Sequence, residues 1–264
     1  MDIKYANPKA VSLQNLKIFL GEIDNVYLRK DGIQSLSDEE IKLLFVRPSN
    51  EVSTATVLTE KVARGGQIDV MASFGLPANK TEKEDRIIFY KDTIVNLHDN
   101  FIYADAAADV ETKNWCALYV EEGANVVFEA NEGGIGHADG SYKLNQDGPY
   151  CITNFGGTIT IKSGKYEGLG TCVYGYSGTT IIEGGYFDAS PVANEGQLTR
   201  PWTLNLLNSA YEDGTAKMIV RGGTFVDFDP SNPNTDDAPT YVDEGYKVVS
   251  ESVNGHTLYT VVKE

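Results

Sequence analysis

The stretch from Arg86 to about Val226 alternates short apolar runs with polar or glycine-containing turns. It opens with RIIFYKDTIVNLHDNFIYAD, and four later segments share one pattern: a strand, a glycine turn, a second strand and then Gly-x-aromatic. These segments begin at Cys116, Cys151, Cys172 and Trp202. Such a unit can bury its apolar face only against its neighbours, so we predict a mainly β chain with a parallel β-solenoid body over residues 86–228.

Equivalent positions in the four segments support this alignment. Gly164, Gly185 and Gly223 share one register. An aromatic residue follows each glycine two positions later: Tyr166, Phe187 and Phe225. The segments that begin at Cys151 and Cys172 are offset by 21 residues, near the length of one solenoid repeat. Longer spacings elsewhere require inserted loops, chiefly at 131–149 and 189–214.

Two further columns make specific predictions about side chains. We expect Cys116, Cys151 and Cys172 to share one repeat position and to form a buried ladder of free thiols. The close-spaced Cys/His pairs of a metal site are absent from the sequence. A second column alternates in charge, and we expect it on one outward face: Glu129, Lys162, Glu183 and Arg221.

Residues 1–48 read as a helical N-terminal anchor and trimerisation segment. A helix is predicted over 13–27, with an apolar seam at spacings of three and four residues: Leu13, Leu16, Leu20, Ile23 and Tyr27. The alternative is an amphipathic helix on a local core. A second helix is predicted over 38–45, with Ser37 as its N-cap. The preceding segment is too polar to form a core alone, and we expect it to order on a partner through Ile3, Tyr5, Pro8 and Val11.

The segments that flank the predicted body also have expected structures. Residues 49–85 form a connecting β region, with strands expected at 53–60 and 67–74. Residues 229–264 form a loop and a hairpin cap, because YKVVSESV and HTLYTVV flank Asn254-Gly255, a strong two-residue turn. Such a cap protects the last open strand from aggregation.

The charge distribution limits the classes of partner. The net charge is −16, which argues against nucleic-acid binding and against an anionic membrane surface. Residues 1–48 contain seven acidic and seven basic residues, so the rest of the chain carries the whole excess. The start, MDIKYANPKAVSLQ, lacks the apolar region of a signal peptide, and no apolar run reaches the length of a membrane span. We therefore expect synthesis in the cytoplasm and no membrane insertion.

The sequence contains no motif that would orient a set of catalytic residues, and we predict no enzymatic activity, no cofactor and no metal site. Carboxylates that could act as a pair are Asp99, Asp105, Glu167 and Asp188. Glu167 and Asp188 share a column, but no motif orients them, and an acidic solvated face is the favoured interpretation. Residues 227–238 match half of a calcium loop but also read as a surface loop. Candidate glycan contacts are Tyr174, Tyr176, Trp202 and Tyr211.

The chain resembles phage fibre proteins over roughly residues 110–264. The ending GGTFVDFDPSNPNTDDAPTYVDEGYKVVS…YTVV is similar to C-terminal segments of fibre-like proteins of gut-bacterial phages, including crAss-like phages. The resemblance implies a virion surface fibre, a homotrimer that its N-terminus attaches to the major capsid protein or another head protein. It also implies a structural role, with adhesion to host or mucus glycans as an added one. A tail fibre or spike that binds, or less plausibly cleaves, a host glycan is the alternative.

Overall fold

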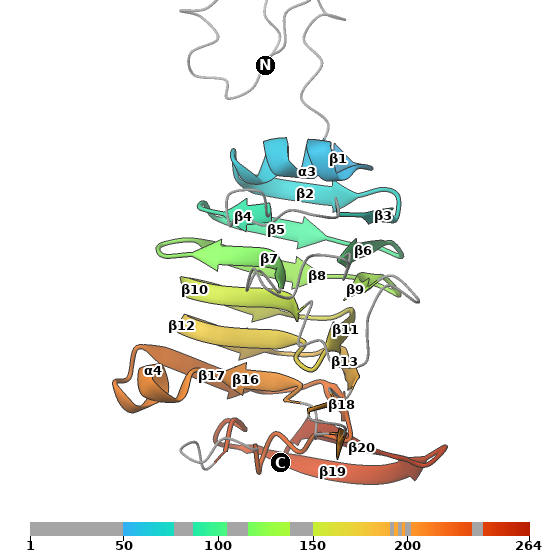
Figure 1. Cartoon of the computed structure of the whole chain (residues 1–264), viewed down its shortest axis with the longest axis vertical. Coiled ribbons are helices and arrows are strands. Elements are labelled where there is room, and N and C mark those ends of the chain that lie inside the picture. The colour runs from blue at the N-terminus through green and yellow to red at the C-terminus, as the bar shows by residue number, and fades with distance from the viewer. Residues whose placement is uncertain are drawn as a thin grey trace, which may run out of the picture. The chain divides into compact units, whose positions relative to one another are not determined.

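The computed structural model is mainly β, with two largely parallel sheets and two short helices (Figure 1). It describes residues 50–76, 87–104, 116–137, 150–190, 193–194, 197–198, 202–233 and 240–264. The fold class is confirmed at this level. The helices predicted over 13–27 and 38–45, together with all of 1–48, lie outside the described residues.

Sheet A has ten strands and all of its pairs are parallel. Its main path is β1 (Glu51–Val52), β2 (Gly66–Val70), β5 (Thr93–Asn96), β8 (Asn125–Glu129), β10 (Tyr150–Ile161), β12 (Val173–Ile182) and β16 (Leu204–Leu206). β7 (Cys116–Glu121) pairs with β10 and with β4 (Ile87–Phe89), and β17 (Ala216–Val220) pairs with β12.

Sheet B has eight strands, of which the first six pair in parallel: β3 (Phe74–Gly75), β6 (Phe101–Ala104), β9 (Gly134–His137), β11 (Lys165–Leu169), β13 (Tyr186–Ser190) and β18 (Thr224–Val226). The last two, β20 (His256–Lys263) and β19 (Tyr246–Val253), are antiparallel. They form the predicted C-terminal hairpin around Asn254 and Gly255, both at positive φ. A separate pair joins β14 (Ala193–Asn194) to β15 (Gln197–Leu198).

Along the chain up to β18, one or two strands of sheet A are followed by one strand of sheet B, and the strands lie one above another in Figure 1. We use "level" for one repeat of this stack: β2 with β3, β5 with β6, β8 with β9, β10 with β11, β12 with β13, and β17 with β18. The register between β10 and β12 joins Ile152 to Val173, and that between β11 and β13 joins Lys165 to Tyr186. Both pairs are 21 residues apart, so the predicted offset is confirmed.

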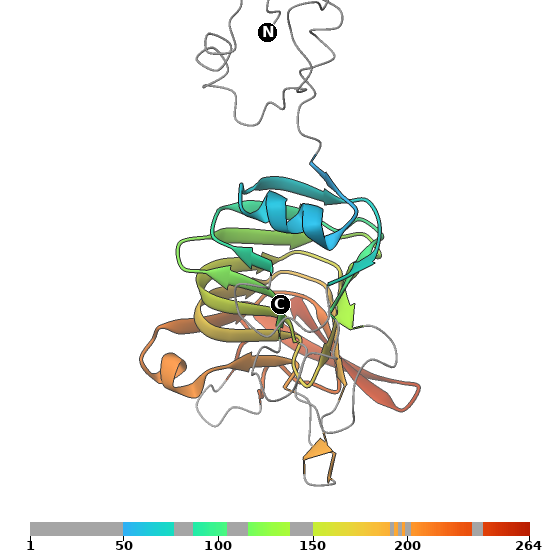
Figure 2. The same cartoon turned by 45° about the horizontal axis from the view of Figure 1, so that its top comes forward.

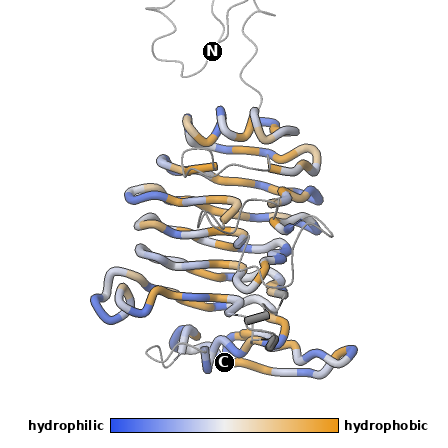
Figure 3. The backbone as a smooth tube through the Cα atoms, viewed as in Figure 1, coloured by the Kyte–Doolittle hydropathy of each residue, from blue (hydrophilic) through white to orange (hydrophobic). Residues whose placement is uncertain are grey.

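The core lies between the sheets and consists of inward columns that continue from level to level. In sheet A one column is fully buried: Ile68, Val95, Phe128, Ile161, Ile182 and Val220. In sheet B the matching column contains Ile102, Ile135, Tyr166, Phe187 and Phe225. Apolar segments recur at every level in Figure 3, and each buried side chain of this size contributes about 1.5–3 kcal/mol.

The predicted aromatic column forms a continuous stack. The rings of Tyr166 and Phe187 are 5.0 Å apart with planes at 13°, and those of Phe187 and Phe225 are 4.9 Å apart at 12°. The Tyr166 hydroxyl donates to the Ser163 carbonyl at 3.0 Å, so this buried polar atom is satisfied. Gly164, Gly185 and Gly223 precede these rings at φ of 108°, 110° and 97°, where a side chain would be strained.

A buried asparagine supports the bend in the middle of β10, where the register to β12 is irregular. The Asn154 side-chain oxygen accepts from the N–H groups of Gly156 and Gly157 at 3.2 and 2.9 Å. Its amide nitrogen donates to Gly157, and to Thr179 and Thr180 on the next level, at 3.0–3.2 Å. The side chain is fully buried and satisfied, so it fixes both the bend and the register of β12.

The predicted cysteine ladder is right for two residues and wrong for the third. Ile152 pairs with Val173, so Cys151 lies opposite Cys172. Cys116, however, pairs with Tyr150 and is therefore displaced by one residue. A shift of one residue moves a side chain to the other face of a strand. Cys116 thus packs with Ile88, Tyr119 and Tyr150 in a separate cluster, although all three cysteines are buried.

The strand predicted at 53–60 is also wrong, because residues Ala55–Val62 form the helix α3. The abundance of β-branched residues in STATVLTEKV favoured a strand. Thr54 caps the helix, however, and its hydroxyl accepts from the Val57 N–H at 3.3 Å. Leu58 and Val62 are four residues apart and bury one helical face, and α3 lies over the first strands in Figure 2. The strand predicted at 67–74 corresponds to β2.

The second helix, α4 (Asn208–Glu212), lies within the segment that aligned as the fourth repeat, between β16 and β17. None of the helices in the described part of the chain is long and apolar enough to cross a membrane.

The charged column is confirmed in register. Ile161 pairs with both Phe128 and Ile182, and Ile182 pairs with Val220, which aligns Lys162 with Glu129 and Glu183, and Glu183 with Arg221. Lys162 Nζ lies 3.5 Å from Glu129 Oε2. Arg221 forms its closest ion pair outside the column, with Asp243 at 2.7 Å.

We predict that Phe187→Ala lowers the free energy of unfolding by about 3–5 kcal/mol, because it leaves a cavity in the middle of the aromatic stack. Chemical denaturation followed by circular dichroism measures the change. Tyr186→Ala is the matched control, since Tyr186 is adjacent but outward and 37% exposed. A loss as large in the control as in Phe187→Ala would contradict the inward assignment.

We also predict that Cys151 and Cys172 react with thiol reagents only after unfolding. Both side chains are buried, and burial raises the pKa of the Cys151 thiol well above its ordinary value, which suppresses the reactive thiolate. Labelling followed by mass spectrometry measures the reaction, with unfolded protein as the positive control. Rapid labelling of either residue in folded protein would disprove the ladder.

Candidate functional site

A cluster of ionisable side chains lies on the outer side of sheet B near the C-terminal hairpin. Glu167 on β11 is directly opposite Asp188 on β13, as the sequence predicted. The turn after β18 adds Asp227, and the hairpin adds His256, whose Nδ1 lies 2.7 Å from Asp227 Oδ2. Tyr186 is near enough to three of the carboxylates for their charges to affect its hydroxyl. Neighbouring strands of a sheet lie about 4.8 Å apart, so Glu167 and Asp188 are direct neighbours.

Burial and neighbouring charges shift the pKa values of these side chains in different directions. Burial raises the pKa of Asp188, while His256 and His137 lower it and Asp227 raises it further. Partial burial also disfavours the charged form of Asp227, but the hydrogen bonds from His256 and from the Thr257 N–H outweigh it, so the pKa of Asp227 is lowered. The hydrogen bond to Asp227 raises the pKa of His256.

The contacts of Asp227 indicate what this cluster does. Asp227 has a positive φ of 53°, which is strained for a residue other than glycine. Its carboxylate accepts from Thr257 N–H at 2.8 Å, and its own N–H donates to the Thr257 carbonyl at 2.8 Å. Together with His256, these bonds hold the hairpin against the end of β18. The arrangement therefore joins two chain segments, and it aligns no nucleophile with a base.

The sequence did not bring Asp227 and His256 together. It placed Asp227 in a surface loop that matches half of a calcium loop, and His256 in the hairpin. Only the antiparallel register of β18 with β20, in which Val226 pairs with Leu258, places them side by side. Asp229, the next acidic residue of that loop, accepts from the Ser231 N–H and hydroxyl at 2.9 and 2.7 Å, as in a local turn. Residues 234–239 of the loop lie outside the described residues.

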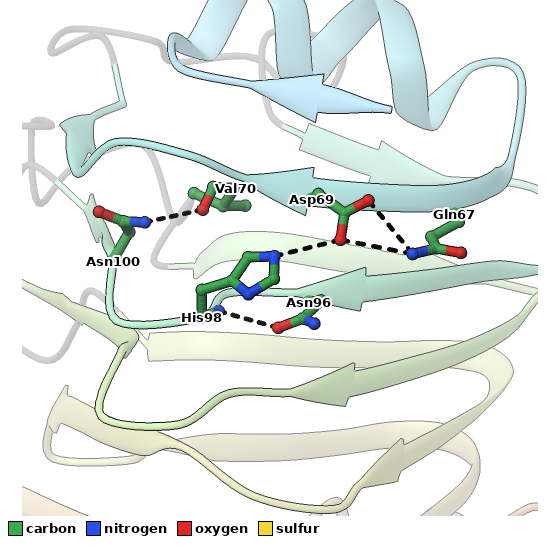
Figure 4. Close-up of polar contacts among 6 residues, drawn as sticks. All are labelled: Gln67, Asp69, Val70, Asn96, His98 and Asn100. Carbon is green, nitrogen blue, oxygen red and sulfur yellow. Dashed lines mark hydrogen bonds and ion pairs between the residues drawn. The ribbon is translucent and has the colours of Figure 1, made fainter. Parts of the chain in front are cut away.

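A second histidine–aspartate contact lies on the outer side of sheet A (Figure 4). His98 Nε2 is 3.1 Å from Asp69 Oδ1, and Gln67 donates to both Asp69 oxygens at 3.4 and 3.2 Å. The His98 backbone has a φ of 50°, and its N–H donates to the Asn96 side chain at 2.9 Å. Asn100 donates to the Val70 carbonyl at 2.8 Å. These bonds fix the turn after β5 onto β2.

Two of the four candidate glycan contacts meet in an aromatic cluster on the outer face of sheet A. The ring of Tyr176 is 4.8 Å from Phe155, which in turn stacks on Tyr119 at 5.4 Å. Tyr174 contacts Tyr176 at 6.3 Å and Tyr150 at 5.8 Å. Because these rings pack against one another, most of their faces are already covered. Tyr176 is 45% exposed and offers the largest accessible surface of the cluster.

The other two candidates lie elsewhere. Tyr211 is on α4 and packs against the main core. Trp202 precedes β16, and its backbone N–H donates to the Gly170 carbonyl at 2.9 Å. Among the described residues, no ring contact joins either one to Tyr174 or Tyr176. The predicted trimer contacts (Leu13, Leu16, Leu20, Ile23 and Tyr27) and capsid contacts (Ile3, Tyr5, Pro8 and Val11) lie outside the described residues. Asp105 does too, and Asp99 accepts from the Glu132 N–H at 3.3 Å.

Metal ligands do not converge in the part of the chain that the structure describes: no three His, Cys, Asp or Glu side chains there could hold an ion together. Comparisons with family models, with curated proteins and with solved structures find no match for this chain.

We predict that His256 titrates above its ordinary pKa of 6.5 in the folded protein, because ionised Asp227 stabilises its charged form. The pKa of His256 is raised, so its stabilising effect is complete below 6.5 and is lost as pH rises through the folded pKa. The pKa of Asp227 is lowered, so its effect is present above 3.8 and is lost as pH falls through the folded pKa. The ion pair therefore stabilises the fold between the folded pKa of Asp227 and the folded pKa of His256.

NMR titration of the His256 ring measures this shift. Asp227→Asn should return the pKa of His256 toward 6.5, whereas Asp229→Asn, the control, should leave it unchanged. An unchanged titration in Asp227→Asn would show that the ion pair is absent in solution.

Proposed function

We propose that this protein is a structural virion protein: one chain of a homotrimeric fibre that is attached to a phage capsid and projects from its surface. The resemblance of residues 110–264 to phage fibre proteins suggests the class. The observation that carries the proposal is a stack of parallel strands in register, with α3 over its first strands and an antiparallel hairpin on its last one. Such a body suits a rigid projection, because covered ends prevent it from adding further copies end to end.

We further propose that the two sheets are faces of one β-solenoid. Three observations support this winding: one or two strands of sheet A are followed by one strand of sheet B at each level, neighbouring levels pair in parallel, and one core contains the inward columns of both sheets. Glycines with positive φ at equivalent positions supply the turns that such a winding needs.

The attachment is proposed to lie in residues 1–48. This segment is balanced in charge, whereas the remainder carries the net charge of −16. Three acidic bodies repel one another, so their association requires apolar contacts. Leu13, Leu16, Leu20 and Ile23 would supply such contacts in a coiled coil, and the segment before them would bind the major capsid protein or another head protein.

We predict that antibodies against the protein label the heads of purified virions in immunogold electron microscopy. Deletion of residues 1–12 should leave a trimer, measured by light scattering, that no longer binds capsids in a sedimentation assay. The undeleted chain is the control. Labelling confined to tails, or full capsid binding by the deleted protein, would refute the proposed attachment.

The second candidate is a tail fibre or spike that binds a host glycan. The exposed ring of Tyr176 beside Phe155 favours it, because an accessible aromatic face is a common contact for sugars. Glycan-array binding that Tyr176→Ser abolishes, with Tyr90→Ser as the control because Tyr90 follows β4 and is 59% exposed, would support this alternative. Release of reducing sugar that depends on Glu167 or Asp188 would instead indicate a cleaving spike.

A further inference from the structure

The outer face of sheet A carries an apolar column along most of the stack. We call it the outer stripe: Ile94, Val127, Thr160, Ile181 and Ile219. Register places each member directly beside the next, on five successive levels. None belongs to the core, Ile94 is 45% exposed, and the other four are half-buried. A parallel sheet usually has both faces covered, so this face has the composition of a contact surface.

The columns on either side of the outer stripe are polar. One is the charged column Glu129, Lys162, Glu183 and Arg221. The other is Asn125, Thr158, Thr179 and Lys217. Charges along the first column alternate, so this face lacks the strong acidity of the whole chain. A second copy of an acidic protein can approach here with little repulsion.

We propose that the outer stripe is the surface through which the bodies of this protein associate with one another, parallel and in register, around an axis that runs along the stack. The number of copies, three, rests on the proposed function. In this arrangement each level contributes the same residue from every copy, so that Ile181 meets Ile181 and Ile94 meets Ile94.

The flanking columns favour this parallel arrangement. Rotation about an axis along the stack places the charged column of one copy opposite the polar column of the next. Glu183 then faces Thr179 and Lys162 faces Thr158, so charged groups meet neutral hydrogen-bonding groups. The level that brings Arg221 near Lys217 is the exception, and there Asp243 already pairs with Arg221 at 2.7 Å.

An inverted pair satisfies the same columns less well. If one copy is inverted so that Thr160 faces Thr160, the residues of the two outer stripes still face each other, with Ile94 against Ile219. Lys162 then meets Lys162, and Glu129 meets Glu183, which are like charges. A shift by one level pairs Lys162 with Glu183 and Glu129 with Arg221, but it leaves Ile94 outside the contact. The opposite shift places Gln67 against Ile219. An inverted pair therefore loses either the match of opposite charges or the apolar contact at one end of the outer stripe.

The narrow width of the outer stripe favours three copies over two. Two sheets packed face to face would bury the charged column, and the Lys162 and Glu129 side chains are 49% and 36% exposed in one chain. Burial of such charges without new partners is unfavourable. Around a three-fold axis, only the central column of each sheet lies near the axis, and the charged column stays at the rim.

The test is chemical cross-linking of the full-length protein with a short bismaleimide. Ile94→Cys and Ile219→Cys each place a thiol at one end of the outer stripe, while the three native thiols are buried. We expect each variant to cross-link to itself in about two thirds of its chains, because one linker joins two of three symmetry-related copies. Val249→Cys on β19 is the matched control: Val249 is also 45% exposed but lies on sheet B, and we expect no cross-link.

Each alternative outcome overturns a stated part of the proposal. No cross-link in the single variants or in the double variant, with the fold intact by circular dichroism, excludes the outer stripe as a contact. Cross-linking only when both substitutions are present shows an inverted pair. The assay uses purified protein, so its failure is distinct from that of the fibre function: a protein that labels virion heads but does not cross-link refutes only the outer stripe.

Discussion

Register between neighbouring levels is the constraint on which the rest of this structure depends. Each level is too thin to enclose a core of its own, so its inward side chains are buried by the levels above and below. Phe187 illustrates this dependence, because its ring is covered by Tyr166 on one side and by Phe225 on the other. A strand displaced by one residue would expose such a ring and bury its polar neighbours.

Two different features stabilise the bends in the chain, and both help to keep neighbouring levels in register. At Gly164, Gly185 and Gly223 the backbone turns with positive φ, which favours glycine at this position on three successive levels. At the bend in β10, the side-chain amide of Asn154 forms the hydrogen bonds that stabilise the irregular backbone. Its bonds to Thr179 and Thr180 reach the next level, so the polar group that shapes one strand also aligns its neighbour.

The sequence predicted the features that repeat and missed those that depend on contacts between distant segments. The glycine, aromatic and charged columns could be aligned because the same residue types recur at the end of the second strand, although the spacing between segments varies. Cys116 was placed one residue out of register, since its segment precedes a long insertion that hides the spacing. α3 was missed because β-branched residues outweighed the capping threonine. The contact of Asp227 with His256 had no local signal, because it arises only when the hairpin folds back on β18.

Because of the charged column, the charge interactions along the stack depend on whether an odd or an even number of levels is added or lost. Glu129, Lys162, Glu183 and Arg221 follow one another on successive levels with alternating sign. Loss of a single 21-residue level between Ile161 and Ile182 would keep every inward column but would place Glu129 beside Glu183. Loss of the next level as well would bring Glu129 beside Arg221 and restore attraction, worth about 0.2–1 kcal/mol per pair. In the charge interactions of this column alone, a change in length by two levels is therefore less unfavourable than a change by one.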